Sequence, residues 1–200
     1  MTLSIYDLVT RAGFLLGIEE PIQSFNDDTR ESIVFGNLWE HVLQNLLTGG
    51  DWAFATKTAE LSRLSDEPAD PNWQYQFQLP HDYLAARSAM DEGGSRIVYT
   101  IEGDRVLADS SRAFLKYIFQ PEVTVLPAYF VTLYVAALAY AAAEPLVGVG
   151  TVSERMKRDL DMAMREARIR DGKNEPSRSV ITPSRFLKAR WTEGSAHARR

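Results

Sequence analysis

The chain has 200 residues and a formal net charge of −5, and 45% of its residues are hydrophobic and 24% charged. These values are ordinary for a soluble globular chain of one domain, or of one domain with an appendage. The sequence contains no cysteine, which excludes disulfides, thiolate metal ligands and a cysteine nucleophile. Residues 1–14 lack the cationic-then-apolar pattern of a signal peptide, so we expect the protein to be made and kept in the cytoplasm.

Charge is distributed unevenly along the chain. Residues 173–200 hold seven basic and two acidic side chains, which gives this tail a charge of +5 and leaves −10 for the rest. A basic tail on an acidic body suggests that the tail contacts something the body does not, although a solvated tail has the same composition. An acidic body repels phosphates, but an acidic lining suits a channel through which DNA slides without sticking.

Two helices are predicted at the N-terminus. Ser4 and Asp7 have the spacing of a capping box, and an apolar stripe follows until Gly17, a natural helix stop. Asp28 and Glu31 repeat this spacing and predict a second helix over residues 29–47, which the glycines at 49–50 end. The expected inward positions are Ile5, Leu8, Val9, Ala12, Leu15 and Leu16 in the first helix, and Val34, Leu38, Val42 and Leu46, flanked by Ile33 and Leu43, in the second.

A change of periodicity at Trp52 predicts β structure. Apolar residues alternate with polar or small ones at Trp52 and Phe54, and again over residues 73–79 and 97–101. Residues 106–108 and 113–119 are further strand candidates, residues 102–105 form a turn, and residues 91–95 form a mobile tip. We therefore expect a small antiparallel β region between the second and third helices.

The uncharged segment Val123–Ala143 is bracketed by Glu122 and Glu144 and is rich in alanine and tyrosine. Pro127 suits a first helical turn, and a helix that is apolar on all sides is buried in protein or inserted in lipid. Its length would allow a membrane span. Because alanine is only weakly lipophilic and the flanks are acidic rather than basic, we favour a central helix packed by other helices.

A fourth helix is predicted after the glycines at 148 and 150. Thr151 and Glu154 form a third capping box, and the helix should run to about Arg170 and end at Gly172. Its expected inward side chains are Met156, Leu160, Ala163 and Ala167.

The predicted fold is α+β and mainly α. A four-helix bundle-like body, residues 1–50 and 123–171, carries a β insertion at residues 51–122. Together they form one domain, residues 1–171, which is followed by an extended basic tail, residues 172–200, that docks on a partner.

A search for catalytic patterns is negative. The three histidines, His41, His81 and His197, have no metal-ligand spacing, and phosphate-loop and GxSxG motifs are absent. We therefore expect no metal and no cofactor. Paired acids, such as Asp66/Asp70 or Asp91/Glu92, have the residue types of a glycosidase, so a glycan-degrading hydrolase acting in infection is an open alternative.

Several local patterns resemble the phage tail tubular protein A family, the head-to-tail adaptors of short-tailed phages. Residues 15–22 (LLGIEEPI) are similar to the exit of that family's first helix, and residues 50–55 (GDWAFA) to the end of its long helix. Residues 73–84 (WQYQFQLPHDYL) are similar to its aromatic strand and the corner that follows. Together with the tyrosine-rich central helix and the end of the fourth helix, the resemblance covers residues 3–171.

This resemblance implies a structural virion protein without enzymatic activity. About twelve copies would form a ring between the portal protein and the tail nozzle, with a central channel for DNA, which is not bound sequence-specifically. The protein would be assembled in the host cytoplasm and located in the neck of the virion. A connector of a long-tailed phage and a small membrane protein are further alternatives. The residues expected to dock on the portal are Arg178, Arg185, Phe186, Lys188, Arg190 and Trp191.

Overall fold

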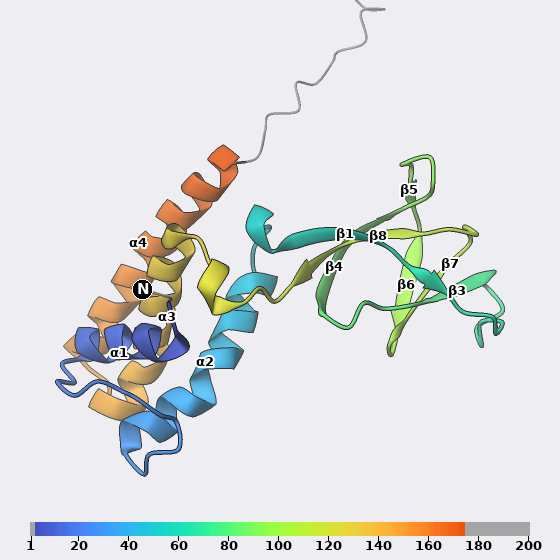
Figure 1. Ribbon diagram of the computed structural model, residues 1–200. Coiled ribbons are helices and arrows are strands. Elements are labelled where there is room, and N and C mark those ends of the chain that lie inside the picture. The colour runs from blue at the N-terminus through green and yellow to red at the C-terminus, as the bar shows by residue number, and fades with distance from the viewer. Residues whose placement is uncertain (1–2, 175–200) are drawn as a thin grey trace, which may run out of the picture.

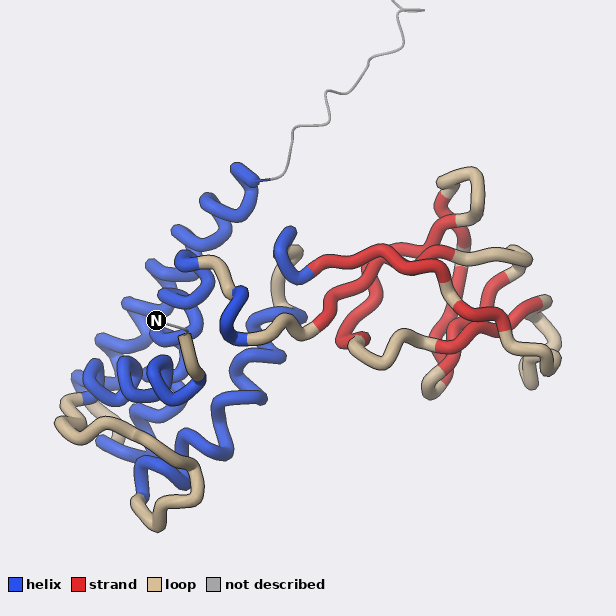
Figure 2. Tube along the Cα trace, viewed as in Figure 1, coloured by secondary structure: helices blue, strands red, loops and turns tan. Residues whose placement is uncertain are grey.

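The computed structural model describes residues 3–174, which form two lobes (Figure 1). The helical lobe contains α1 (Ile5–Leu16), α2 (Arg30–Thr48), α3 (Ala128–Val147) and α4 (Thr151–Asn174). The β lobe, residues 56–119, contains eight strands in the described part of the chain and projects away from the helices (Figure 2). The six residues expected to dock on the portal, Arg178, Arg185, Phe186, Lys188, Arg190 and Trp191, lie outside the described residues.

The predicted fold class, a mainly α bundle with a small β region, is wrong. Of the described residues, 47% are helical and 20% are in strands, and the strands form two antiparallel sheets of four strands each. The first sheet has the order β1-β8-β4-β5 and the second β2-β3-β7-β6. Their bounds are β1 (Thr56–Glu60), β2 (Ser62–Arg63), β3 (Tyr75–Gln78), β4 (Tyr83–Met90), β5 (Arg96–Ile97), β6 (Tyr99–Glu102), β7 (Arg105–Ala108) and β8 (Phe114–Phe119).

The central helix α3 is packed by α1, α2 and α4. Eleven of its twenty residues are buried, which explains why this segment has no polar face. The ring of Tyr134 is fully buried, and its hydroxyl donates to the carbonyl oxygen of Trp39 on α2 at 2.5 Å. Burial raises the pKa of Tyr134, so this hydroxyl stays protonated and keeps its role as a donor.

Local capping rules place both ends of α1 but only in part those of α2 and α4, and α4 begins at Thr151 itself, which was predicted as its N-cap. Ser4 and Asp7 form the predicted capping box, and Gly17 ends α1 in the left-handed conformation with φ 87°. The second N-cap is Thr29 rather than Asp28, because the Thr29 hydroxyl accepts from the backbone N–H of Ser32 at 3.2 Å. At the other end of the chain α4 continues past Gly172 to Asn174.

The longest strand, β4, is absent from the sequence-based expectation. It contains three alanines and an arginine, and its pairing with β8 is interrupted by two register shifts, which destroy the alternation that marks a strand. The two sheets enclose a core of their own, and its buried members are Leu61, Phe77, Ala89, Val106, Ala108, Ala113, Leu115 and Tyr117.

The chain crosses between the lobes twice, through paired strands. β1 and β8 pair from Thr56 with Ile118 to Glu60 with Phe114, and short 3₁₀ turns, η1 (Ala53–Ala55) and η2 (Val123–Val125), connect them to the helices. The strand predicted around Trp52 and Phe54 is wrong, since this segment forms η1 and Trp52 belongs to the helical core.

By length and composition, α3 is the one helix among the described residues that would be able to cross a membrane. The same properties belong to the core helix of a globular protein, and 56% of its most apolar stretch is buried in this structure.

Candidate functional site

Three of the four acidic side chains considered for sugar hydrolysis, Asp70, Asp91 and Glu92, take part in local turns or an ion pair. Asp70 Oδ1 accepts from the backbone N–H and the side-chain amide of Asn72, at 3.0 and 2.8 Å. Asp91 Oδ1 accepts from the backbone N–H of Ser95 at 2.8 Å, and Glu92 pairs with Arg112. Within residues 3–174, no group of three or more histidine or acidic side chains is placed to hold a metal ion.

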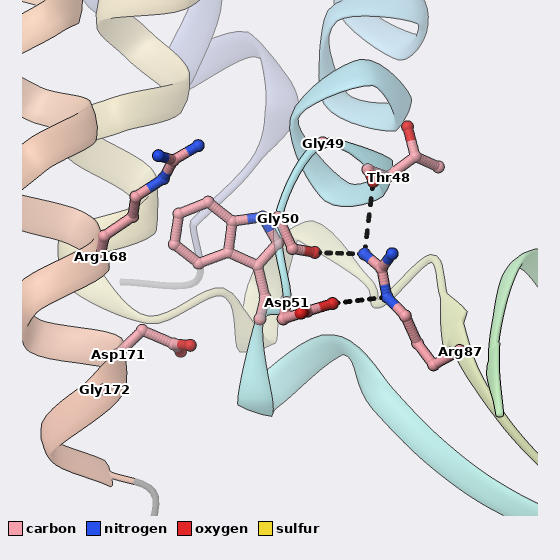
Figure 3. A pocket seen from close by; sticks show the side chains of 9 residues that line it. Thr48, Gly49, Gly50, Asp51, Arg87, Arg168, Asp171 and Gly172 are labelled. Carbon is pink, nitrogen blue, oxygen red and sulfur yellow. Dashed lines mark hydrogen bonds and ion pairs between the residues drawn. The ribbon is translucent and has the colours of Figure 1, made fainter.

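A polar site lies where the two lobes meet, and Arg87 on β4 is its centre (Figure 3). Its Nη2 donates to the carbonyl oxygens of Gly50 and Thr48, at 2.6 and 3.3 Å, and its Nε pairs with Asp51 at 2.7 Å. The last carbonyls of a helix lack partners within the helix and carry partial negative charge. An arginine from the β lobe therefore caps α2 of the helical lobe.

Trp52 fixes the chain directly after this cap. Its side chain is 2% exposed, its Nε1 donates to the carbonyl oxygen of Leu46 at 2.7 Å, and its ring lies edge-on to Phe130 at 5.1 Å. A Cβ atom at Gly50 would lie 2.7 Å from Trp52 Nε1. Only glycine therefore allows the backbone to pass the indole at this distance.

Asp171 holds the end of α4 against the same junction. This side chain is 4% exposed, and both carboxylate oxygens are used. Oδ2 accepts from the backbone N–H of Ala53 at 3.0 Å and Oδ1 from the hydroxyl of Tyr129 at 2.6 Å. One buried carboxylate thus ties α4 to η1 and to α3.

A cavity of about 400 Å³ lies between these groups. Figure 3 shows Arg87 and Arg168, which is on α4, on opposite sides of the view, with Gly50 and Asp51 between them. Arg87, Asp51 and Asp171 are each engaged with neighbouring protein groups, as described above. We name Arg87, Asp51, Trp52 and Asp171 the junction brace, because Arg87 joins the β lobe to Asp51 and the end of α2, while Trp52 and Asp171 fix the helical side of the junction.

A second polar cluster holds the corner that follows the aromatic strand. Asp82 accepts from Tyr117 at 2.9 Å and pairs with Lys57 at 2.7 Å, which ties the corner to β8 and β1. Partial burial opposes ionisation of Asp82, but the hydrogen bonds from Lys57 and Tyr117 outweigh it and lower the pKa of this carboxyl. Burial, together with Asp82, raises the pKa of Tyr117 to about 12.

The helical lobe also carries an apolar groove of about 420 Å³ between α1, α3 and α4. Its floor is formed by Val131, Val135 and Ala136 of α3, and its walls include Leu15 and Met162, which are 41% and 65% exposed. Leu15 was expected to face inward in α1 but forms part of this wall. Its charged rim consists of Arg11, Asp159 and Glu166.

The sequence-based reasoning missed the junction brace and the groove. The printed partners of Arg87 and Asp171 are 36 or more positions away in the chain, and no local sequence pattern indicates such partners. The burial of Asp171 could have been predicted from the sequence. Asp171 continues the inward stripe of Ala163 and Ala167 by one further step of four residues.

No protein-family model matches this chain, and the search of curated proteins found no match.

Proposed function

We propose that this protein is a structural head-to-tail adaptor, as its resemblance to the tail tubular protein A family implies. The observation that carries the proposal is the distribution of exposed large apolar side chains. Of eleven such residues in the described part of the chain, ten lie in the helical lobe and its connections, and one, Val98, lies in the β lobe. This distribution supports association between subunits through the helical lobe rather than the β lobe.

Five of these ten exposed apolar residues lie in two separate places on the helical lobe, and a ring subunit needs two different contact surfaces. One place is the groove, with Leu15 and Met162. The other, which we call the turn patch, consists of Ile33, Val147 and Val149, with exposures of 53%, 47% and 85%. Arg30 donates to the carbonyl oxygen of Pro145, which brings the start of α2 beside the α3–α4 turn. Contacts between two different patches are heterologous and close into a ring when the rotation permits.

The β lobe provides a second kind of surface for a different neighbour. It has its own core, and Arg87 of the junction brace attaches it to the helical lobe through Thr48, Gly50 and Asp51. An adaptor must transmit a fixed geometry from one neighbour to the next, and these contacts supply that rigidity. We propose that the helical lobes form the ring of about twelve copies, and that the β lobes face the tail nozzle or the outside.

The remaining partners follow from the same proposal. The basic tail docks on the portal through Arg178, Arg185, Phe186, Lys188, Arg190 and Trp191, with its aromatic residues as anchors. DNA passes through the channel without sequence-specific contacts, and the protein resides in the neck of the virion. Deletion of residues 175–200 should abolish portal binding, and portal binding that survives intact would contradict this docking.

The ring is tested by measuring the mass of the chain alone and mixed with the portal protein. The full chain of 22.5 kDa should form a multimeric ring on the portal. A double variant of the turn patch, Ile33→Asp with Val149→Asp, should lose the ring. Val98→Asp is the matched control, because Val98 is 79% exposed but lies in the β lobe. A chain that stays monomeric with the portal, or a ring that survives the double variant, would contradict the proposal.

A further inference from the structure

The groove leaves part of the central helix uncovered. Its floor residues Val131, Val135 and Ala136 are 7–9% exposed, whereas most of the opposite side of α3 is fully buried. With its two partly exposed walls, the groove is an apolar surface that the described residues leave open. Its volume of about 420 Å³ is within the range of ligand-sized pockets and matches one or two large side chains.

We propose that this groove binds residues 184–192 of the same chain, and so is covered in the isolated protein. The proposal goes beyond the adaptor function and does not depend on it. Within these nine residues the sequence places three large apolar side chains, Phe186, Leu187 and Trp191, among three basic ones, Arg185, Lys188 and Arg190.

Charge complementarity supports this occupant. The α4 side of the groove carries Asp159, which is half-buried, and Glu166, which is exposed. Basic side chains that flank an apolar anchor can pair with these acids while the anchor enters the groove. The rim contains one basic residue, Arg11, which lies on the α1 side of the groove. The acidic side of the groove is therefore the side formed by α4.

Chain length permits the contact within one molecule. Met162 lies twelve residues before the end of α4 at Asn174, which is about 18 Å along the helix at 1.5 Å per residue. The nine residues 175–183 can span up to about 30 Å when extended. The segment can therefore turn back and reach the groove on its own helix.

A second molecule of the protein competes only weakly with the chain's own tail for the groove. A flexible connection of this length gives an effective concentration of about 1 mM, which exceeds micromolar protein in solution by about a thousandfold. An isolated chain therefore fills its groove with its own segment first. One consequence rests on the proposed adaptor function: when the portal takes the tail, the groove becomes available to a neighbouring subunit, which would couple ring formation to portal binding.

The absence of cysteine from the chain makes crosslinking unambiguous. We would combine Ala189→Cys, which leaves the aromatic anchors intact, with Met162→Cys in the groove, and treat the full chain with a short bis-maleimide. The matched control pairs Ala189→Cys with Ile169→Cys, because Ile169 is on the same helix, is 61% exposed, and lies nearer to the tail but outside the groove.

We expect the groove pair to link within one chain about tenfold faster than the control pair, because docking holds its two sulfurs together. Adding Phe186→Ser and Trp191→Ser should reduce the groove rate to that of the control. Equal rates for the two pairs would overturn the proposal. Links that form only between chains would also overturn it, because they would identify a second copy as the occupant.

Trypsin cleavage provides a second measurement that needs no crosslink. In the full chain, cleavage after Arg185, Lys188 and Arg190 should be about tenfold slower than in a Met162→Glu variant, in which a carboxylate enters the apolar groove. Ile169→Glu, the matched control, should leave the cleavage rate unchanged. Equal cleavage rates for the full chain and the Met162→Glu variant would overturn the proposal.

Discussion

The two lobes are built around cores of very different size. The core around α3 contains 27 buried apolar residues, of which Ile118 belongs to β8 and the other 26 lie outside the β lobe, whereas the core of the β lobe contains eight. The smaller core leaves less apolar burial to offset the ordering of the backbone. We infer that the β lobe depends on its attachment, through β1, β8 and the junction brace, and that the helical lobe does not depend on the β lobe.

Trp52→Ala should have the largest effect, because it removes a core residue of the helical lobe at the point where the chain enters the β lobe. We expect a loss of about 4 kcal/mol in the free energy of unfolding, typical of a buried tryptophan replaced by alanine. Chemical denaturation followed by circular dichroism measures it. A loss below about 1 kcal/mol would show that Trp52 is not part of the core.

Phe77→Ala should destabilise the β lobe alone and so show that the two lobes unfold independently. Phe77 is fully buried in the β core, and we expect a local loss of about 3 kcal/mol. Amide hydrogen exchange should accelerate in β3 and β7 and stay unchanged in α3. Equal acceleration in α3 would show that the lobes unfold as one unit.

Asp171→Ala should loosen the end of α4, because it leaves the N–H of Ala53 without its acceptor. We expect a loss of about 2 kcal/mol and faster exchange at residues 53–55. Asp161→Ala provides the control, since Asp161 is an exposed acid on the same helix. The prediction fails if both variants have the same stability.

Arg87→Ala should weaken the attachment of the β lobe while leaving both cores intact. We expect a loss of about 1.5 kcal/mol, because the carbonyls at the end of α2 lose a charged donor. Exchange should accelerate at the end of α2 and in β1. Arg96→Ala, which removes an exposed arginine of β5, is the control and should have little effect.

Asp82→Asn should have the smallest effect, and this effect should depend on pH. The pKa of Asp82 is lowered in the folded protein, so its ionised form stabilises the fold above about pH 4 and this contribution is lost as the pH falls through the folded-state pKa. At pH 7 we expect the variant to be about 1 kcal/mol less stable. The difference should shrink as the pH is lowered below 4, and a difference that is constant with pH would contradict this role.

The helical lobe could be predicted from the sequence better than the β lobe. Capping and helix stops depend on residues within one or two turns, so Ser4, Asp7 and Gly17 could be assigned directly. The uniform apolarity of α3 likewise predicted its burial. In α2 the buried stripe is shifted, and Phe35 and Leu47 are buried where Val34 and Leu38 were expected.

The β lobe and the junction depend on partners that are distant in the chain. The two register shifts in β4 conceal it from any rule based on alternation, and β2 and β5 have two residues each. The type II′ geometry of the β6–β7 hairpin could be anticipated, because Gly103 occupies its first central position with φ 61°. The ion pair of Arg87 with Asp51 has no comparable local signature.

Amide hydrogen exchange of the chain alone and in complex with the portal protein tests the central claim most directly. If the helical lobes form the ring, protection on assembly should appear in α1, α4 and the turn patch, and the eight-stranded lobe should show no comparable protection from ring contacts. Protection confined to residues 56–119 would contradict the account, because it would assign self-association to the β lobe.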